Sequence, residues 1–279
     1  MSSLTHWLLA ARPKTLSVTL TPVLAGLALA WAEAGSFAWP VALATLGTAL
    51  LIQIGTNLHN DAADFETGAD TAERIGPARA SAQGWLPPQR VKRAALVCFA
   101  TAFGLGLYLS WVGGWEIFAL GVTSLATGWA YSGGPKPIAY GPLGELVVLL
   151  FFGIAAVAGT YYLQTLQLSP SAFWVGAAIG MPAAAVLLLN NYRDQLQDRR
   201  AGRRTLAIVL GNGPSRAVYG LLLFLPFALP ALLGRPWTWL CLLALPAAGL
   251  LLRRFLNTQI GPALNQILAL TAQLQMGYG

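Results

Sequence analysis

The sequence predicts an all-α integral membrane protein with eight to nine transmembrane helices, arranged as two four-helix halves around a central cavity. Hydrophobic residues make up 56% of the 279 residues, charged residues only 10%, and the mean hydropathy is +0.60. A soluble domain carries about 25% charged residues. Long stretches, such as 94–115 and 146–192, contain no Asp, Glu, Lys or Arg. Every basic residue except Arg235 falls in segments assigned to one side of the membrane, which is the positive-inside pattern.

The predicted spans follow from the charge-free stretches, because a helix of about 20 apolar residues crosses a bilayer. Spans are expected near 15–33, 38–58, 94–111, 115–132, 145–163, 171–190, 217–234 and 237–252. Residues 260–278 contain three glutamines and are expected to form either a short ninth span or a helix at the interface. The whole chain, 1–279, is expected to be one domain, with cytoplasmic cap loops near 59–93, 133–142 and 191–216.

Two clusters of acids and amides mark the cytoplasmic ends of the second and sixth predicted spans. The first contains Asn57, Asn60, Asp61 and Asp64, and the second contains Asn190, Asn191, Arg193, Asp194 and Asp198. Spacings of three and four residues place the acids of each cluster on one helix face. Both spans run in the same direction, so a site between two halves brings these faces together. Carboxylate and amide oxygens suit a hard divalent cation, Mg²⁺ in particular.

Basic and aromatic residues beside the clusters complete the predicted site. Together with Mg²⁺ they are expected to bind a diphosphate. Besides the amides and Arg193, the residues expected to contact it are Arg74, Arg79, Lys136, Tyr140 and Arg203. Asp and Asn also cap helix ends, so one cluster alone favours a structural role, whereas two clusters at equivalent positions favour a functional site. The net charge of +7 lies along the membrane edges, which argues against nucleic acid as a partner.

These residues resemble the two signatures of the UbiA superfamily of intramembrane aromatic prenyltransferases. Asn60, Asp61 and Asp64 match the first signature, and the spacing of Asp194 and Asp198 matches the second. The strings Arg-Pro-Lys-Thr-Leu at 12–16 and Arg-Ile-Gly-Pro at 74–77 resemble the branch that acts on 1,4-dihydroxy-2-naphthoate.

The chain departs from this family pattern at two positions. Gly68 stands where the first signature has a third acid, and Asp70 follows two residues later. Arg203 stands where the branch usually has Lys, which keeps the charge but changes the geometry of phosphate contact. The role of Asp70 in metal binding is therefore left open by the sequence.

The resemblance implies an enzyme that transfers a polyprenyl group from polyprenyl diphosphate to 1,4-dihydroxy-2-naphthoate. CO₂ and diphosphate leave, and the product is demethylmenaquinol in menaquinone biosynthesis. It implies Mg²⁺ as cofactor, held by the catalytic acids Asp61, Asp64, Asp194 and Asp198 together with Asn60.

Two alternatives to this reaction follow from the same residues. The first is a prenyltransferase of the same superfamily that acts on another aromatic acceptor, 4-hydroxybenzoate or homogentisate. A transporter is disfavoured because the predicted spans carry no charges at mid-membrane. The expected location is the cytoplasmic membrane of a bacterium, with lipid around the helices and with the N-terminus and site loops in the cytoplasm.

Overall fold

The computed structural model describes residues 3–70 and 75–279, and helices are the regular elements in both ranges. In chain order they are α1 (Ser3–Ala11), α2 (Pro13–Ala34), α3 (Trp39–Glu66), α4 (Pro88–Gly113), α5 (Trp115–Ala130), η1 (Ile138–Tyr140), α6 (Gly144–Leu149), η2 (Leu150–Ala155), α7 (Ala156–Thr165), α8 (Pro170–Arg200), α9 (Leu206–Leu210), α10 (Asn212–Phe224), η3 (Leu225–Ala228), α11 (Leu229–Leu233), η4 (Pro236–Ala244), α12 (Leu245–Asn257) and α13 (Leu264–Tyr278). The predicted all-α fold class is confirmed. Seven helical segments of the described residues are long and apolar enough to cross a membrane.

One predicted span and the segment left open as a short ninth span or an interfacial helix are both short helices. α5 has 16 residues and α13 has 15, so each extends only about 22–24 Å, less than the ~30 Å hydrocarbon core. α13 packs against α2, α8 and α12 and buries Thr271 and Gln275 completely. This packing makes α13 part of the helix bundle. Whether the full spans number eight or nine stays a prediction.

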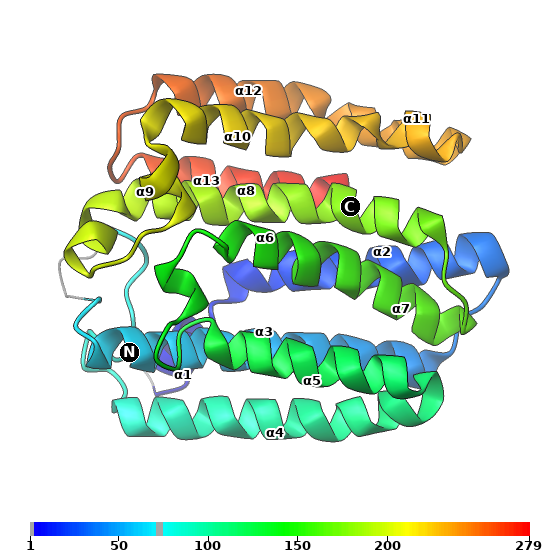
Figure 1. The fold of residues 1–279 in the computed structure, drawn as a ribbon, viewed down its shortest axis with the longest axis horizontal. Coiled ribbons are helices and arrows are strands. Elements are labelled where there is room, and N and C mark those ends of the chain that lie inside the picture. Colours follow the sequence, from blue (N-terminus) through cyan, green and yellow to red (C-terminus); the bar gives the residue numbers. More distant parts are fainter. Residues whose placement is uncertain (1–2, 71–74) are drawn as a thin grey trace.

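The long helices lie side by side, and the short helices α9 and α11 lie at opposite ends of the bundle (Figure 1). In the first half, α3 packs against α2, α4 and α5; in the second, α8 packs against α6, η2 and α10. α2 joins the halves because it also packs against α7 and α8. The last turns of α3 and α8 reach the end of the bundle where η1 and α9 lie, at the left of Figure 1.

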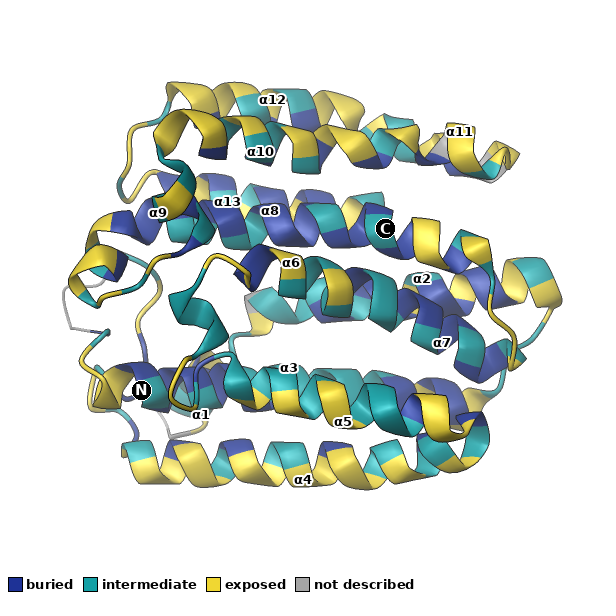
Figure 2. Cartoon of the chain, viewed as in Figure 1, coloured by how far each residue is buried: buried dark blue, intermediate teal, exposed yellow. Residues whose placement is uncertain are grey.

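Peripheral helices turn large apolar side chains outward. Figure 2 shows exposed residues along the outer faces of α4 and α12, and Leu96, Val97, Trp111 and Leu250 are among them. Soluble monomers rarely expose contiguous apolar surface on this scale. Together with the seven apolar segments, these faces confirm an integral membrane protein.

A π-helical segment, η2, interrupts the helix formed by α6 and α7 where that helix packs on α8. A Cβ atom on Gly153 of η2 would lie 2.5 Å from the carbonyl oxygen of Gly176 and 2.6 Å from the Cα atom of Gly180, both on α8. Glycine is therefore required for this close approach, as is common where helices associate in lipid. The contact fixes the α6–α7 helix against α8.

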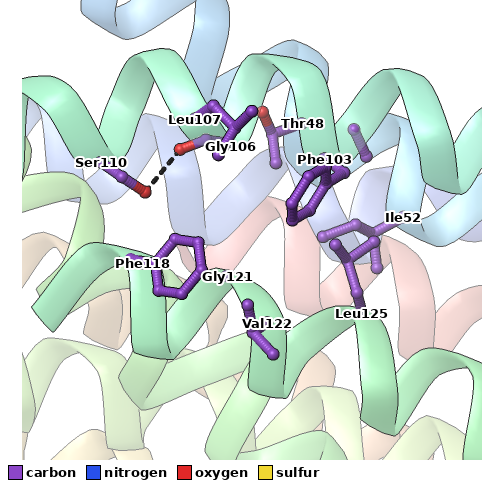
Figure 3. A pocket seen from close by; sticks show the side chains of 11 residues that line it. Thr48, Ile52, Phe103, Gly106, Leu107, Ser110, Phe118, Gly121, Val122 and Leu125 are labelled. Atoms are coloured by element: carbon purple, nitrogen blue, oxygen red, sulfur yellow. Dashed lines mark hydrogen bonds between the residues drawn. The ribbon is translucent and has the colours of Figure 1, made fainter. Parts of the chain in front are cut away.

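A small apolar pocket lies between α3, α4 and α5 (Figure 3). Its described lining includes Ile52, Phe103, Phe118 and Leu125 and contains no charged side chain. Ile52 precedes Asp61 by nine residues on α3, which corresponds to about 14 Å along the helix. The pocket is a packing gap within the first half, and the predicted central cavity between the halves stays a prediction.

Candidate functional site

The acidic ends of α3 and α8 meet across Arg203. The Arg203 guanidinium forms an ion pair with Asp64 of α3 and another with Asp198 of α8, the latter with an Nη1–Oδ1 distance of 3.4 Å. Both carboxylates are buried. The structure therefore brings these two predicted site residues together, at the end of the bundle where the sequence places the cytoplasmic loops.

The chain reversal after α8 carries Arg203 back over the acidic face. α8 ends at Arg200, and Gly202 adopts a left-handed conformation (φ 74°) that favours glycine at a helix end. The Arg203 amide then donates to the carbonyl oxygen of Asp198 at 2.8 Å. Tyr140 of η1 supports the guanidinium, whose Cζ lies 4.9 Å from the ring centroid, a cation–π contact. Tyr140 thus lies at the site beside Arg203.

The charge of Arg203 is secured by its two partners. Burial by itself lowers the pKa of the guanidinium, but the carboxylates of Asp64 and Asp198 raise it above its ordinary value. Arg203 therefore stays a cation, and a positive group already occupies the space between the two acids. This arrangement indicates that the pair of carboxylates accommodates positive charge.

Asn60 is the centre of a buried hydrogen-bond network. Its Oδ1 accepts from Nη2 of Arg12 at 2.8 Å and from Nη2 of Arg79 at 2.9 Å. Its Nδ2 donates to Oδ2 of Asp64 and to Oγ of Ser132, both at 2.9 Å. Asn60 therefore orients one carboxylate and gathers two guanidinium groups beside it, so its amide oxygen already has two protein donors.

Asp61 anchors the loop that follows α3. Its two oxygens accept from the backbone N–H groups of Ala80 and Ser81, each at 2.9 Å, and the side chain is almost completely buried. The adjacent Arg79 also forms a salt bridge with Asp70, with an Nε–Oδ2 distance of 3.1 Å. Asp61 and Asp70 thus both hold the segment around residue 80 against the end of α3.

Asp194 is paired within α8. Arg193 donates to both Asp194 oxygens, at 2.7 and 2.6 Å, and it also donates to Oδ1 of Asn190 at 2.8 Å. A further bond of 2.7 Å reaches Oδ1 of Asn265 on α13, whose Nδ2 donates to the carbonyl oxygen of Ile75. Arg193 is buried, so in the structure it orients Asp194 and connects α8, α13 and the first loop.

The other predicted site residues are more dispersed. Asn57 donates from Nδ2 to the carbonyl oxygen of Ala11 and to Oγ1 of Thr15, which ties α3 to α1 and α2. Asn191 donates to Oε1 of Glu145 at 2.9 Å. Lys136 is exposed. Arg74 lies outside the described residues.

The predicted four-carboxylate cluster is divided among different partners. Across residues 3–70 and 75–279, no three His, Cys, Asp or Glu side chains converge in the manner of a metal cluster. Asp64 and Asp198 share Arg203, whereas Asp61 binds backbone amides and Asp194 binds Arg193. The assignment of all four acids and Asn60 as metal ligands stays a prediction.

Several site residues escaped the sequence reasoning. Arg12, Ser132 and Asn265 make hydrogen bonds to predicted site residues from distant parts of the chain. Glu145 had a usable signal, because it is the one acid in the sequence between Glu116 and Asp194. Arg12 also had a signal, because it begins the Arg-Pro-Lys-Thr-Leu string, whereas Ser132 and Asn265 lack one, since Ser and Asn are common outside functional sites.

The fold and the site together define the class of protein: an all-α membrane bundle whose two acidic helix ends meet beside buried arginines. Residues 19–267 match the UbiA prenyltransferase family, and the chain belongs to this family. Solved structures agree on the fold. A UbiA homolog from Archaeoglobus fulgidus bound to DMAPP and Mg²⁺ superimposes with a TM-score of 0.65 at 14% identity, covering 98% of this chain and 96% of that one.

Two curated bacterial proteins are similar over most of their length. A 1,4-dihydroxy-2-naphthoate octaprenyltransferase of Mycobacterium tuberculosis is 39% identical, with 91% of this chain and 86% of that protein covered. The enzyme of the same name from Escherichia coli is 38% identical, with 86% of this chain and 81% of that protein covered. The similarity supports the naphthoate branch within the family.

Proposed function

We propose that the protein transfers a polyprenyl group from polyprenyl diphosphate to 1,4-dihydroxy-2-naphthoate in a Mg²⁺-dependent reaction that releases CO₂ and diphosphate. The product is demethylmenaquinol, an intermediate of menaquinone biosynthesis. The observation that carries the proposal is the meeting of Asp64 and Asp198 across Arg203, in a chain that is 39% identical to a curated enzyme of that name.

The donor set around Arg203 fits a hard divalent cation. Asp64 and Asp198 offer buried carboxylate oxygens, and a guanidinium already sits between them. Asp194 lies one helical turn before Asp198 on α8, where Arg193 donates to both of its oxygens. Mg²⁺ prefers a small number of carboxylates together with substrate phosphates, and when bound it neutralises charge that develops on the leaving diphosphate. Of the other predicted ligands, Asp61 is assigned to anchoring the loop around residue 80, and Asn60 to orienting the Asp64 carboxylate.

The remaining residues bind and position the diphosphate. Arg203 is the main phosphate contact, because its guanidinium offers several donors and faces both acids. Arg79 and Arg12 add positive charge on the Asn60 side. Tyr140 lies beside Arg203, and we assign Lys136, from the same loop after α5, to the diphosphate as well. Donors aimed at the leaving oxygens stabilise the transition state more than the bound substrate.

The charge asymmetry of the chain sets the proposed location. The basic segments face the cytoplasm of a bacterial cell, and the helices lie in its cytoplasmic membrane, surrounded by lipid. The polyprenyl chain then enters from the lipid while the diphosphate reaches the site at the cytoplasmic end.

The test uses the purified full-length protein in lipid nanodiscs with a polyprenyl diphosphate. Each of 1,4-dihydroxy-2-naphthoate, 4-hydroxybenzoate and homogentisate is supplied as acceptor, with Mg²⁺ or with EDTA. We expect a prenylated product and CO₂ release only with the naphthoate and Mg²⁺. Asp64→Ala is expected to abolish turnover, while Glu116→Gln, an exposed acid on α5, leaves it unchanged. Product with another acceptor alone overturns the assignment.

A further inference from the structure

Glu145 is a buried carboxylate that has only part of its hydrogen-bonding capacity filled. It lies near the start of α6, and the residue is 4% exposed. Oε1 accepts from Nδ2 of Asn191 at 2.9 Å, whereas Oε2 is buried without a hydrogen-bond partner among the described residues. Buried carboxylates usually have all of their oxygens satisfied because desolvation is costly. The free oxygen is therefore a feature that needs an explanation.

A hydrogen bond to Asn191 ties Glu145 to the second acidic cluster on α8. Asn191, which holds Oε1, is three residues before Asp194 on α8. Tyr131 follows α5, and its hydroxyl lies 3.8 Å from the position of a Cβ atom built on Gly144. Glu145 thus lies against the acidic end of α8, and the Tyr131 hydroxyl lies near the preceding residue, Gly144.

We propose that Oε2 of Glu145 binds a ring hydroxyl of the aromatic acceptor, the hydroxyl on the carbon next to the one that bears the carboxylate. This assignment rests on the proposed function and extends it to the second substrate. A carboxylate that accepts from a hydroxyl increases the electron density of the ring. The adjacent ring carbon is the nucleophile, so the interaction acts where the new bond forms.

The proposed step balances in protons and electrons. The ring carbon forms a bond to the allylic carbon of the donor while the allylic C–O bond breaks and its electron pair leaves with diphosphate. The hydroxyl proton moves to Oε2, and the ring oxygen becomes a carbonyl. When the carboxylate group leaves as CO₂, the electron pair of that C–C bond restores the aromatic ring. The proton then returns from Glu145 to the ring oxygen.

A structural role for Glu145 makes a different prediction. In that case the carboxylate only ties α6 to α8 through Asn191, and replacing it weakens every ligand of the site to a similar degree. In the proposed role it weakens only ligands that carry the hydroxyl. Two acceptor analogues separate these cases: 1-hydroxy-2-naphthoate, which has the hydroxyl, and 2-naphthoate, which lacks it.

The experiment measures inhibition constants of both analogues for the wild-type protein and for Glu145→Gln in nanodiscs. A hydrogen bond to a charged group is worth enough for the wild type to prefer the hydroxyl analogue by about 10-fold or more. We expect this preference to fall to about 1–3-fold in Glu145→Gln, because the neutral amide is a weaker acceptor. Glu145→Asp, with a shorter carboxylate, is expected to show an intermediate preference. Equal weakening of both analogues, or an unchanged preference, overturns the inference.

Two further measurements keep this outcome distinct from failure of the proposed function. Glu145→Gln is expected to retain the wild-type KM for polyprenyl diphosphate in Mg²⁺, and Glu116→Gln is the matched control for loss of an acid away from the cluster. If the wild type gives no product with 1,4-dihydroxy-2-naphthoate, the proposed function is wrong. If the wild type is active and Glu145→Gln turns over with unchanged kcat and acceptor KM, only the role of Glu145 is wrong.

Discussion

Replacement of Asp61 by Ala tests whether this acid anchors a loop or binds metal. In the structure both oxygens of Asp61 accept from the N–H groups of Ala80 and Ser81 at 2.9 Å, and all three residues are at most 2% exposed. Hydrogen bonds to a charged acceptor contribute about 1.5–3 kcal/mol each. Loss of both therefore costs about 3–6 kcal/mol before any water enters to compensate.

The loss is expected to appear as local opening of the loop. At about 1.4 kcal/mol for each factor of ten, even 3 kcal/mol raises the open population about 100-fold. Trypsin reports this population directly, because Arg79 precedes Ala80 and is only 8% exposed in the closed loop. Cleavage after Arg79 in nanodiscs is expected to accelerate strongly in Asp61→Ala, since proteolysis follows the open fraction when reclosing is fast.

The control is Glu66→Ala in the last turn of the same helix. Glu66 forms an exposed pair with Lys92, and exposed pairs of this kind contribute about 0–1 kcal/mol. Its effect on cleavage is expected to be small. If Asp61→Ala leaves cleavage after Arg79 unchanged but removes Mg²⁺-dependent binding of polyprenyl diphosphate, Asp61 is a metal ligand and the anchor role is wrong.

Three other substitutions, the last with a matched control, test the site and the bundle. Arg203→Ala is expected to raise the KM for polyprenyl diphosphate about 10-fold or more, and an unchanged KM would exclude Arg203 as a phosphate contact. Asn265→Ala removes one bond from Arg193 and one to a backbone carbonyl, so we expect about 2–4 kcal/mol of destabilisation, seen as a lower Tm in detergent. Gly153→Ala is expected to cost about 1–3 kcal/mol of stability by overpacking. The control is Gly104→Ala, where an added Cβ meets no neighbouring atom within 4 Å, so it is expected to be neutral or stabilising. Equal Tm values for the two variants would contradict the close approach at Gly153.

Much of the fold follows from the sequence because bilayer thickness constrains element length. Charge-free stretches mark the spans, and the helical spacing past the apolar run predicts that α3 continues to the second acid. α3 does so, ending at Glu66. Residues 260–278 are ambiguous in the sequence, because a segment with three glutamines suits a helix at the membrane interface as well as a short span. Packing resolves part of this, since Gln275 is completely buried against neighbouring helices that composition does not reveal.

The site was predictable in its residue types and less so in its pairings. Equivalent positions on two parallel spans predicted that Asp64 and Asp198 come together, and they meet across Arg203. Nothing in the spacing distinguishes Asp61 from Asp64, because the difference lies in a loop that folds back from residue 80. Likewise, the commitment of Arg193 to Asn265 depends on α13, a helix far along the chain.

The π-helical segment η2 determines the direction in which Glu145, the residue proposed to bind the aromatic acceptor, points. A π-turn holds one residue more than an α-turn, and one residue corresponds to a rotation of about 100° in an α-helix. Glu145 lies before η2 and the rest of the helix lies after it. Conversion of η2 to a regular α-helix by deletion of one residue would therefore swing Glu145 away from Asn191 by more than a quarter turn. The extra residue in η2 therefore determines the rotation of α6 about its axis, and with it the direction in which Glu145 points.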